Sequence, residues 1–176
     1  MAESVRLIIA MEDHSRPTAA PDCGGSNART QLSSLAPQCL AADPNHATRL
    51  YCGTFGDGLW RSEDGGDSWQ HVGGLSAQRV TSVAVSAEDV ADGFGAVFAG
   101  SEPSAVFRSN DGATTWRECQ GLDGLPSAST WSFPPRPETH HVRWIAPDPA
   151  VHARLFVAIE AGALIHSLDG GASWHD

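Results

Sequence analysis

A short phrase that occurs three times limits the folds open to this chain. Each copy has a Ser, an Asp two positions later, glycine directly after the Asp, and a Trp five positions after the Asp, at residues 62–69, 109–116 and 167–174. A phrase that returns at wide intervals is typical of a repeat architecture, in which each copy marks one structural unit. The chain therefore reads as a series of similar units.

The residues before the phrases repeat as well. Residues 43–62 align with 148–167 without a gap, and 97–116 align equally well once a short insertion is allowed at 88–95. Each unit carries four strand signals, and an Asp-Pro turn joins the first two strands in the first and third units. A four-stranded antiparallel meander repeated in tandem is the blade of a β-propeller. We therefore predict an all-β fold, a partial β-propeller of about three to four four-stranded antiparallel blades.

Composition agrees with this class and excludes others. The chain has 18 Gly, 11 Pro and 6 Trp, and 41% hydrophobic residues, but no long helical apolar stripe, a pattern typical of many short strands joined by turns. The net charge of −10 makes nucleic acid a poor partner. The apolar run at residues 5–11 is too short for a membrane span and lacks a signal-peptide pattern. We expect a cytoplasmic location, no membrane association and no cofactor.

The repeated phrase has a mechanical explanation. It lies where the third strand of a unit turns back into the fourth, so its glycines supply positive φ and its Asp accepts hydrogen bonds from the turn, while the Trp buries a large ring. A single metal or catalytic site needs each role once, whereas all three copies keep the same residues. We therefore expect no metal, and a structural role for Ser62, Asp64, Gly66, Trp69, Ser109, Asp111, Gly112, Trp116, Ser167, Asp169, Gly171 and Trp174.

The repeats divide the chain as follows. Three units are expected at about 37–78, 79–120 and 142–176, with a long loop between units at 121–141. Residues 1–36 carry fainter traces of the same pattern and are expected to hold a strand and a mobile loop, the remnant of an eroded unit.

The cysteines form no C-x-x-C pair and no spacing typical of zinc. Cys39 and Cys52 fall on adjacent predicted strands, so a disulfide between them and two buried free thiols are both open. The lack of an export signal favours free thiols.

The three phrases, with strand signals between them, resemble the Asp-box or BNR repeat of sialidase-like β-propellers, in particular uncharacterised bacterial glycosidase-like proteins. The resemblance covers residues 37–176 and implies Asp-box hairpins, but it is specific for a fold and not for an activity. Proteins with this repeat include sialidases, xyloglucanases, sorting receptors and photosystem assembly factors. Membership of the sialidases would imply an F/Y-R-I-P motif, an arginine triad and a Tyr nucleophile. The chain lacks the motif, and its only tyrosine, Tyr51, takes the core slot of Phe98 and Phe156.

The loop at 121–141 is the strongest candidate for recognition, because connections longer than the architecture requires often carry function. Trp131 could stack on a sugar ring, and Arg136 and Arg143 could hold a carboxylate or phosphate, with His140 beside them. The alternative is that the loop prolines stiffen a crossing between units while the aromatic rings fill a gap.

Glycoside hydrolysis requires two carboxylates about 5 to 10 Å apart. Within the loop, Glu138 and Asp123 are the first catalytic candidates. Glu102 and Glu160 come next, because they occupy equivalent positions before the third strand of their units.

Two functions remain open. The first is an incomplete propeller that acts as a non-catalytic scaffold and binds a carbohydrate or protein ligand; this chain would then not be an enzyme. The alternative is a fragment of an exo-acting, sialidase-like glycoside hydrolase that lacks its remaining blades. Unpaired strand edges at an open end also predict self-association.

Overall fold

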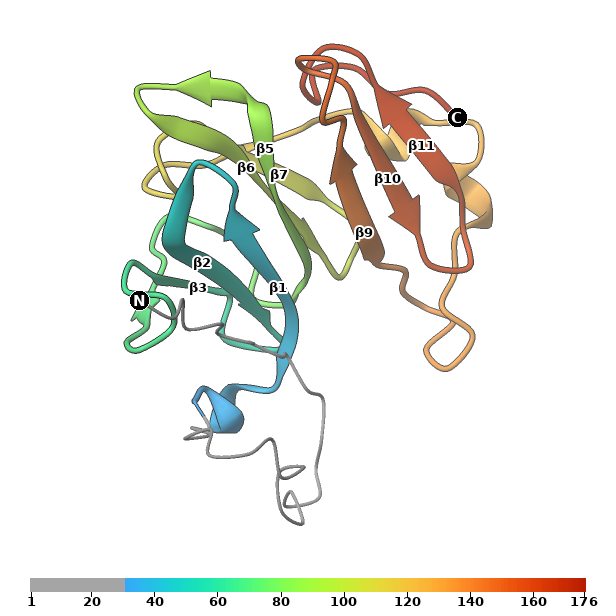
Figure 1. Cartoon of the computed structure of the whole chain (residues 1–176). Helices are drawn as coiled ribbons and strands as arrows, with labels where there is room; N and C mark the ends of the chain where they lie inside the picture. The colour runs from blue at the N-terminus through green and yellow to red at the C-terminus, as the bar shows by residue number, and fades with distance from the viewer. Residues whose placement is uncertain (1–30) are drawn as a thin grey trace, which may run out of the picture.

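The structure is a computed structural model that describes residues 31–176. After the 3-10 helix η1 (Ser33–Leu35), the chain builds three consecutive antiparallel sheets (Figure 1). The expected strand and loop of residues 1–30 lie outside the described residues. The first sheet contains β1 (Pro37–Asp43), β2 (His46–Thr54), β3 (Leu59–Ser62) and β4 (Gln70–His71), in that order.

The second and third sheets repeat the first. The second contains β5 (Val80–Ala91), β6 (Phe94–Ser101), β7 (Val106–Ser109) and β8 (Arg117–Glu118), again in chain order. The third contains β9 (Val142–Pro147), β10 (Leu155–Ile159) and β11 (Leu164–Ser167), and a bridge between His166 and His175 marks the place of a fourth strand. The predicted all-β architecture of four-stranded antiparallel units is confirmed.

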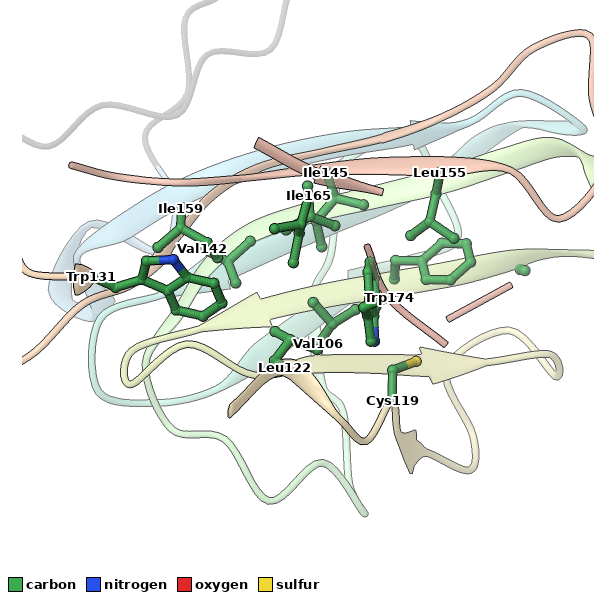
Figure 2. Packing of buried hydrophobic residues seen from close by; sticks show 13 residues of the cluster. Val106, Cys119, Leu122, Trp131, Val142, Ile145, Leu155, Ile159, Ile165 and Trp174 are labelled. Atoms are coloured by element: carbon green, nitrogen blue, oxygen red, sulfur yellow. The ribbon is translucent and has the colours of Figure 1, made fainter. Parts of the chain in front are cut away.

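The sheets pack face to face, and the core lies between them. Tyr51 and Leu59 of the first sheet are fully buried against the second sheet, together with Val80 and Val97. A second cluster fills the space between the second and third sheets, where Trp131 lies beside the third-sheet residues (Figure 2). The alternation of side chains along each strand thus gives every sheet two apolar faces.

Two glycines allow this close approach. A Cβ at Gly53 would lie 2.7 Å from Val80 Cγ1, and a Cβ at Gly100 would lie 2.6 Å from Val142 Cβ. Both distances are shorter than any van der Waals contact allows. The first strand of each following sheet therefore crosses where the preceding sheet has no side chain.

The repeated phrase forms the same turn in each sheet, called here the Ser–Asp–Trp turn. In the second copy the hydroxyl of Ser109 donates to Asp111 (2.7 Å), the backbone N–H of Thr115 donates to the same carboxylate (2.9 Å), and the N–H of Ala113 donates to Ser109 Oγ (2.9 Å). The other two copies repeat this pattern with distances of 2.8 Å. The carboxylate therefore accepts hydrogen bonds from backbone N–H groups that have no strand partner in the tight turn.

These hydrogen bonds stabilise the charged form of each Asp. The pKa of Asp64 and that of Asp169 fall to about 2, chiefly because the hydroxyls of Ser68 and Ser173 donate to them. Desolvation acts against the same change at Asp111, but hydrogen bonds from Thr115 prevail and lower its pKa to about 2 as well.

The tryptophans differ from the expectation that each ring is buried. Trp174 is buried in the core between the second and third sheets, whereas Trp69 and Trp116 are only half-buried. The three turns share one geometry, so the difference arises from what packs around each ring. Figure 2 shows the Trp174 ring close to Cys119 of the preceding sheet.

Arginines join the second and third turns to the sheets before them. Arg61 on β3 donates to the carbonyl oxygen of Gly112, and Arg108 on β7 donates to the equivalent carbonyl of Gly170 (3.2 Å). Each acceptor is the residue directly after the Asp of the next turn. The turns are thus joined to their neighbours as well as to their own sheets.

The described cysteines are free thiols, as the sequence favours. Cys39 pairs with Gly53 across the ladder, whereas Cys52 pairs with Leu40. The two thiols therefore point to opposite faces of the first sheet and cannot form a disulfide. Burial raises the pKa of Cys39 to about 12 and that of Cys52 to about 11. Among residues 31–176, no helix has the length and apolar character needed to cross a membrane.

Candidate functional site

In each sheet, the connecting segment after the second strand lies beside the connecting segment before the first strand; these segments are called links here. In each sheet, the backbone N–H of the residue after the second strand donates to a carbonyl oxygen just before a first strand, at 3.0 to 3.1 Å. The pairs are Phe55 with Ala36, Glu102 with Arg79, and Glu160 with His141. The repeat thus brings side chains from three sheets to one end of the molecule.

Glu102 is the centre of this end. Its side chain is 1% exposed, and it accepts hydrogen bonds from Nε (3.2 Å) and Nη2 (2.6 Å) of Arg136 and from Nη1 of Arg79 (3.2 Å). His141 Nδ1 lies 3.8 Å away. A buried carboxylate is costly unless it is paired and hydrogen-bonded, and here two guanidinium groups meet that requirement.

A second carboxylate lies on the other side of His141. Nε2 of His141 is 3.0 Å from Glu160 Oε2, and Nε of Arg143 is 3.3 Å from the same oxygen. The imidazole of His141 therefore stands between the carboxylates of Glu102 and Glu160. We call these six residues, Arg79, Glu102, Arg136, His141, Arg143 and Glu160, the charged cluster.

Two aromatic rings support the arginines. The guanidinium of Arg79 lies over Phe55 at 4.9 Å from the ring centroid, and that of Arg136 lies 5.3 Å from the same ring and 4.9 Å from Phe133. His141 meets Phe133 edge to face at 4.8 Å. Stacking on ring faces holds the guanidinium groups in fixed orientations.

A groove of about 670 Å³ lies beside the charged cluster, between the links of the first and second sheets. Phe55, Ala77 and Phe107 give it apolar walls, while Arg79, Glu102 and Ser104 give it polar ones. Ser104 is 8% exposed, and within the described residues its Oγ has no hydrogen-bond partner. A buried hydroxyl of this kind on a groove wall can bind a ligand's polar atom.

Two arginines against one carboxylate leave excess positive charge beside the groove although the chain is acidic, because Arg79 lines the groove and Arg136 lies next to it at Glu102. Arg79 and Arg136 share one carboxylate, and their side chains remain 49% and 41% exposed. Each guanidinium has five N–H donors, of which Glu102 takes only one or two. This end of the molecule can therefore bind a carboxylate and an adjacent apolar group.

The loop at 121–141 joins this site only in part. Arg136 reaches Glu102, and Arg143, just beyond the loop, reaches Glu160. Trp131 is 6% exposed, packs in the core and donates from Nε1 to Ser127 Oγ (3.0 Å), so its ring is not presented to a sugar. His140 packs edge to face on Trp131 at 5.5 Å. For these two rings the geometry favours the gap-filling alternative.

The first catalytic candidates lie apart from the charged cluster. Asp123 belongs to the 3-10 helix η2 (Leu122–Gly124), and both it and Glu138 are exposed to solvent. Neither carboxylate has the enclosed surroundings that are typical of a general acid in a glycosidase site. Glu102 and Glu160 are brought together, but the imidazole of His141 occupies the space where a glycosidic bond would have to lie.

Sequence reasoning missed Phe55, Arg79 and Ser104. The repeat alignment did contain a signal for the first two, since Phe55 shares a slot with Glu102 and Glu160, and Arg79 shares one with His141. Ser104 has no such signal, because its importance depends on the groove that forms around it.

Comparison with known proteins supports the fold. No protein-family model matches the chain, and no curated protein matches its sequence. An ancestral GH74 enzyme matches at a TM-score of 0.58 and 22% identity, over 78% of this chain and 17% of its own. A structure of YCF48 bound to D1 peptide matches at a TM-score of 0.58 and 17% identity, over 80% of this chain and 40% of its own. The GH74 xyloglucanase from Xanthomonas campestris matches at a TM-score of 0.58 and 19% identity, over 78% of this chain and 23% of its own.

These similar structures are β-propellers, and this chain spans less than half the length of each. At such identities the likeness concerns the fold alone. Together with the three stacked four-stranded units, it confirms a partial β-propeller.

Proposed function

We propose that this chain is a non-catalytic recognition module that binds a peptide in the groove between its first and second sheets. The observation that carries the proposal is the groove, where the half-exposed Arg79, a buried unpartnered hydroxyl and aromatic walls lie together, with the half-exposed Arg136 beside it at Glu102. This combination of apolar surface with a few fixed polar groups is typical of ligand sites.

The groove chemistry suggests the kind of peptide. Arg79 and Arg136 would bind a carboxylate, either an acidic side chain or a C-terminus, and Ser104 would bond a backbone polar atom. Phe55 and Phe107 would contact an apolar side chain beside it. YCF48, a protein of similar fold, has been solved with a peptide bound, which supports a peptide as the ligand class.

The state of the titratable groups favours binding over catalysis. Glu102 and Glu160 are held in ion pairs with arginines, and Nε2 of His141 contacts Glu160. A general acid or base must reach the reacting atoms, and these groups are turned toward each other. The charged cluster would then serve to orient the arginines.

We also propose that the chain belongs to the Asp-box propellers. The support is that all three Ser–Asp–Trp turns share one hydrogen-bond pattern, in which Ser and Asp side chains bond each other and the turn's own N–H groups. A turn that recurs in this form on successive sheets is the feature for which such repeats are named.

The test begins with peptides selected against the wild-type chain from a random library, with affinities measured by calorimetry. Arg79→Gln and Ser104→Ala should each weaken binding at least about tenfold, equivalent to about 1.4 kcal/mol. Ser104→Ala removes only a hydroxyl, so its effect on folding should be small. Arg143→Ala, whose side chain is 65% exposed and outside the groove lining, is the matched control.

Equal affinity of the wild-type and both groove variants would refute the groove as the site. The glycoside hydrolase alternative is tested on the same proteins with a panel of aryl glycosides. Turnover that is abolished by Glu160→Gln would replace the binding proposal with that alternative.

A further inference from the structure

The outer face of the third sheet exposes large apolar side chains in a row. Trp144, Ala158 and Leu164 are cross-strand neighbours on β9, β10 and β11, and Phe156 lies on the same face. Trp144 is 69% exposed, Leu164 66% and Phe156 37%. We call these four residues the outer face. Contiguous apolar surface of this kind marks an interaction site.

The equivalent positions in the other sheets are covered. The position of Phe156 corresponds to Tyr51 in the first sheet and Phe98 in the second. The position of Leu164 corresponds to Leu59 and Val106, because the second and third strands pair in the same register in all three sheets. All four are at most 1% exposed, since the next sheet packs on them. The outer face therefore repeats a surface that receives another sheet.

A polar donor accompanies the outer face as well. Arg61 and Arg108 donate to the glycine carbonyl in the turn of the next sheet. His166 stands in the corresponding slot of the third sheet, opposite Phe156, and its ring is 5.3 Å from that of His175. An imidazole N–H can donate to a carbonyl in the same way.

The first sheet has the complementary surface. On the face turned away from the second sheet, Leu40 and Trp60 are half-buried, while Cys52 between them is 3% exposed. The residues in the same slots of the other sheets, Val83 with Phe107 and Ile145 with Ile165, are at most 8% exposed because a preceding sheet covers them. We call the pair Leu40 and Trp60 the receiving face.

The residues that would meet at the contact between the outer face and the receiving face also match in size. Val80 and Val142 cross over Gly53 and Gly100, where no Cβ fits. The third sheet has Ala158 in the glycine slot, so a branched valine in the same pose would collide with its methyl group. The first sheet begins instead with Pro37 in the valine slot, which lacks the branched Cβ.

We propose that the outer face binds the receiving face of a second copy of this chain, head to tail. Residues 31–176 of two copies would supply six sheets, within the four to eight blades at which propellers close. A head-to-tail interface that closes on itself gives a ring of defined size. The inference rests on the sheet faces and is independent of the groove and its ligand.

The first experiment measures the mass of the chain by light scattering and sedimentation at rising concentration. The wild-type chain should form a dimer by about 100 µM, a concentration that even a weak interface reaches. Leu164→Asp and Trp144→Glu should keep it monomeric, while Val90→Asp, an exposed apolar site at 46% away from the outer face, should still dimerise. A wild-type chain that stays monomeric throughout would overturn the proposal.

The second experiment separates a head-to-tail contact from one between two outer faces. Trp60→Glu alters only the receiving face and should be monomeric alone, yet it should pair with Leu164→Asp when the two are mixed, since one intact interface then remains. Thermal melting would first establish that both variants are folded. If Trp60→Glu alone dimerises as the wild type does, the contact does not use the receiving face and the proposal fails.

Discussion

The three aspartates of the Ser–Asp–Trp turns affect how the free energy of unfolding depends on pH. Their pKa values of about 2 in the folded chain lie below the value of about 3.9 in an unfolded one. A depressed pKa contributes stability that is complete above about pH 5 and is lost as the pH falls toward 2.

The pH dependence of unfolding tests this assignment. Urea denaturation should give a constant free energy of unfolding from pH 7 to about pH 5 and a decline between about pH 4 and pH 2. Asp111→Asn should reduce the size of that decline, because one of the carboxyl groups with a lowered pKa is removed. An unchanged decline in this variant would contradict the hydrogen-bond account of its pKa.

The position two residues after each Asp gives a second prediction. Gly171 has φ 86° and a Cβ there would lie 2.6 Å from Cys119 Sγ, whereas the second copy already carries Ala113 at φ 69°. Gly171→Ala should lower the free energy of unfolding by about 2 to 3 kcal/mol, from positive φ and overlap together. Cys119→Ala in the same chain should recover part of the loss.

If Gly171→Ala were as stable as the wild type by urea denaturation, the packing of Cys119 against that turn would be wrong. Ala113→Gly serves as the control. Relief of positive φ there is offset by added chain entropy and a lost buried methyl group, so the change should be within about 0.5 kcal/mol.

At the level of elements, the arginines that join neighbouring sheets differ in their surroundings. Arg108 pairs with Asp89, whose side chain is 9% exposed, at 2.8 Å, and lies over Phe98 at 5.5 Å. Arg61 pairs instead with Glu63, whose side chain is 49% exposed. Loss of Arg108 would leave a buried carboxylate without its cation, while loss of Arg61 would leave a solvated one.

Arg108→Ala should therefore lower the free energy of unfolding by about 3 kcal/mol, and Arg61→Ala by about 1 kcal/mol. Chemical denaturation of the two variants at neutral pH gives the comparison. Similar losses in both would mean that the bond to the next turn, and not the buried ion pair, decides stability at these positions.

The strands could be predicted because the same sequence pattern recurs in each unit. The strand signals of the third unit predict strands at 155–159 and 163–167, and the structure has strands at Leu155–Ile159 and Leu164–Ser167. The burial of each Trp was not predictable in the same way. Trp174 and Trp69 occupy identical slots in the phrase, yet the space around a ring depends on neighbouring sheets and links that are distant in sequence.

At the scale of the whole molecule, the candidate site is assembled from links that belong to different sheets. Phe55, Arg79, Glu102 and Arg136 are spread over some eighty residues and meet because the sheets stack in order with their links at one end. The sequence pointed to Arg136 by its unusual loop. It did not point to Arg79 as its partner, because that contact depends on how closely successive sheets approach.

The most direct test of the account is amide hydrogen exchange of the chain with and without a selected peptide. Binding in the groove predicts slower exchange at residues 55–58, 76–80 and 101–106, and unchanged exchange at Asp123 and Glu138. Slower exchange only at the backbone amides of Asp123 and Glu138, with unchanged exchange in the groove segments, would contradict binding in the groove.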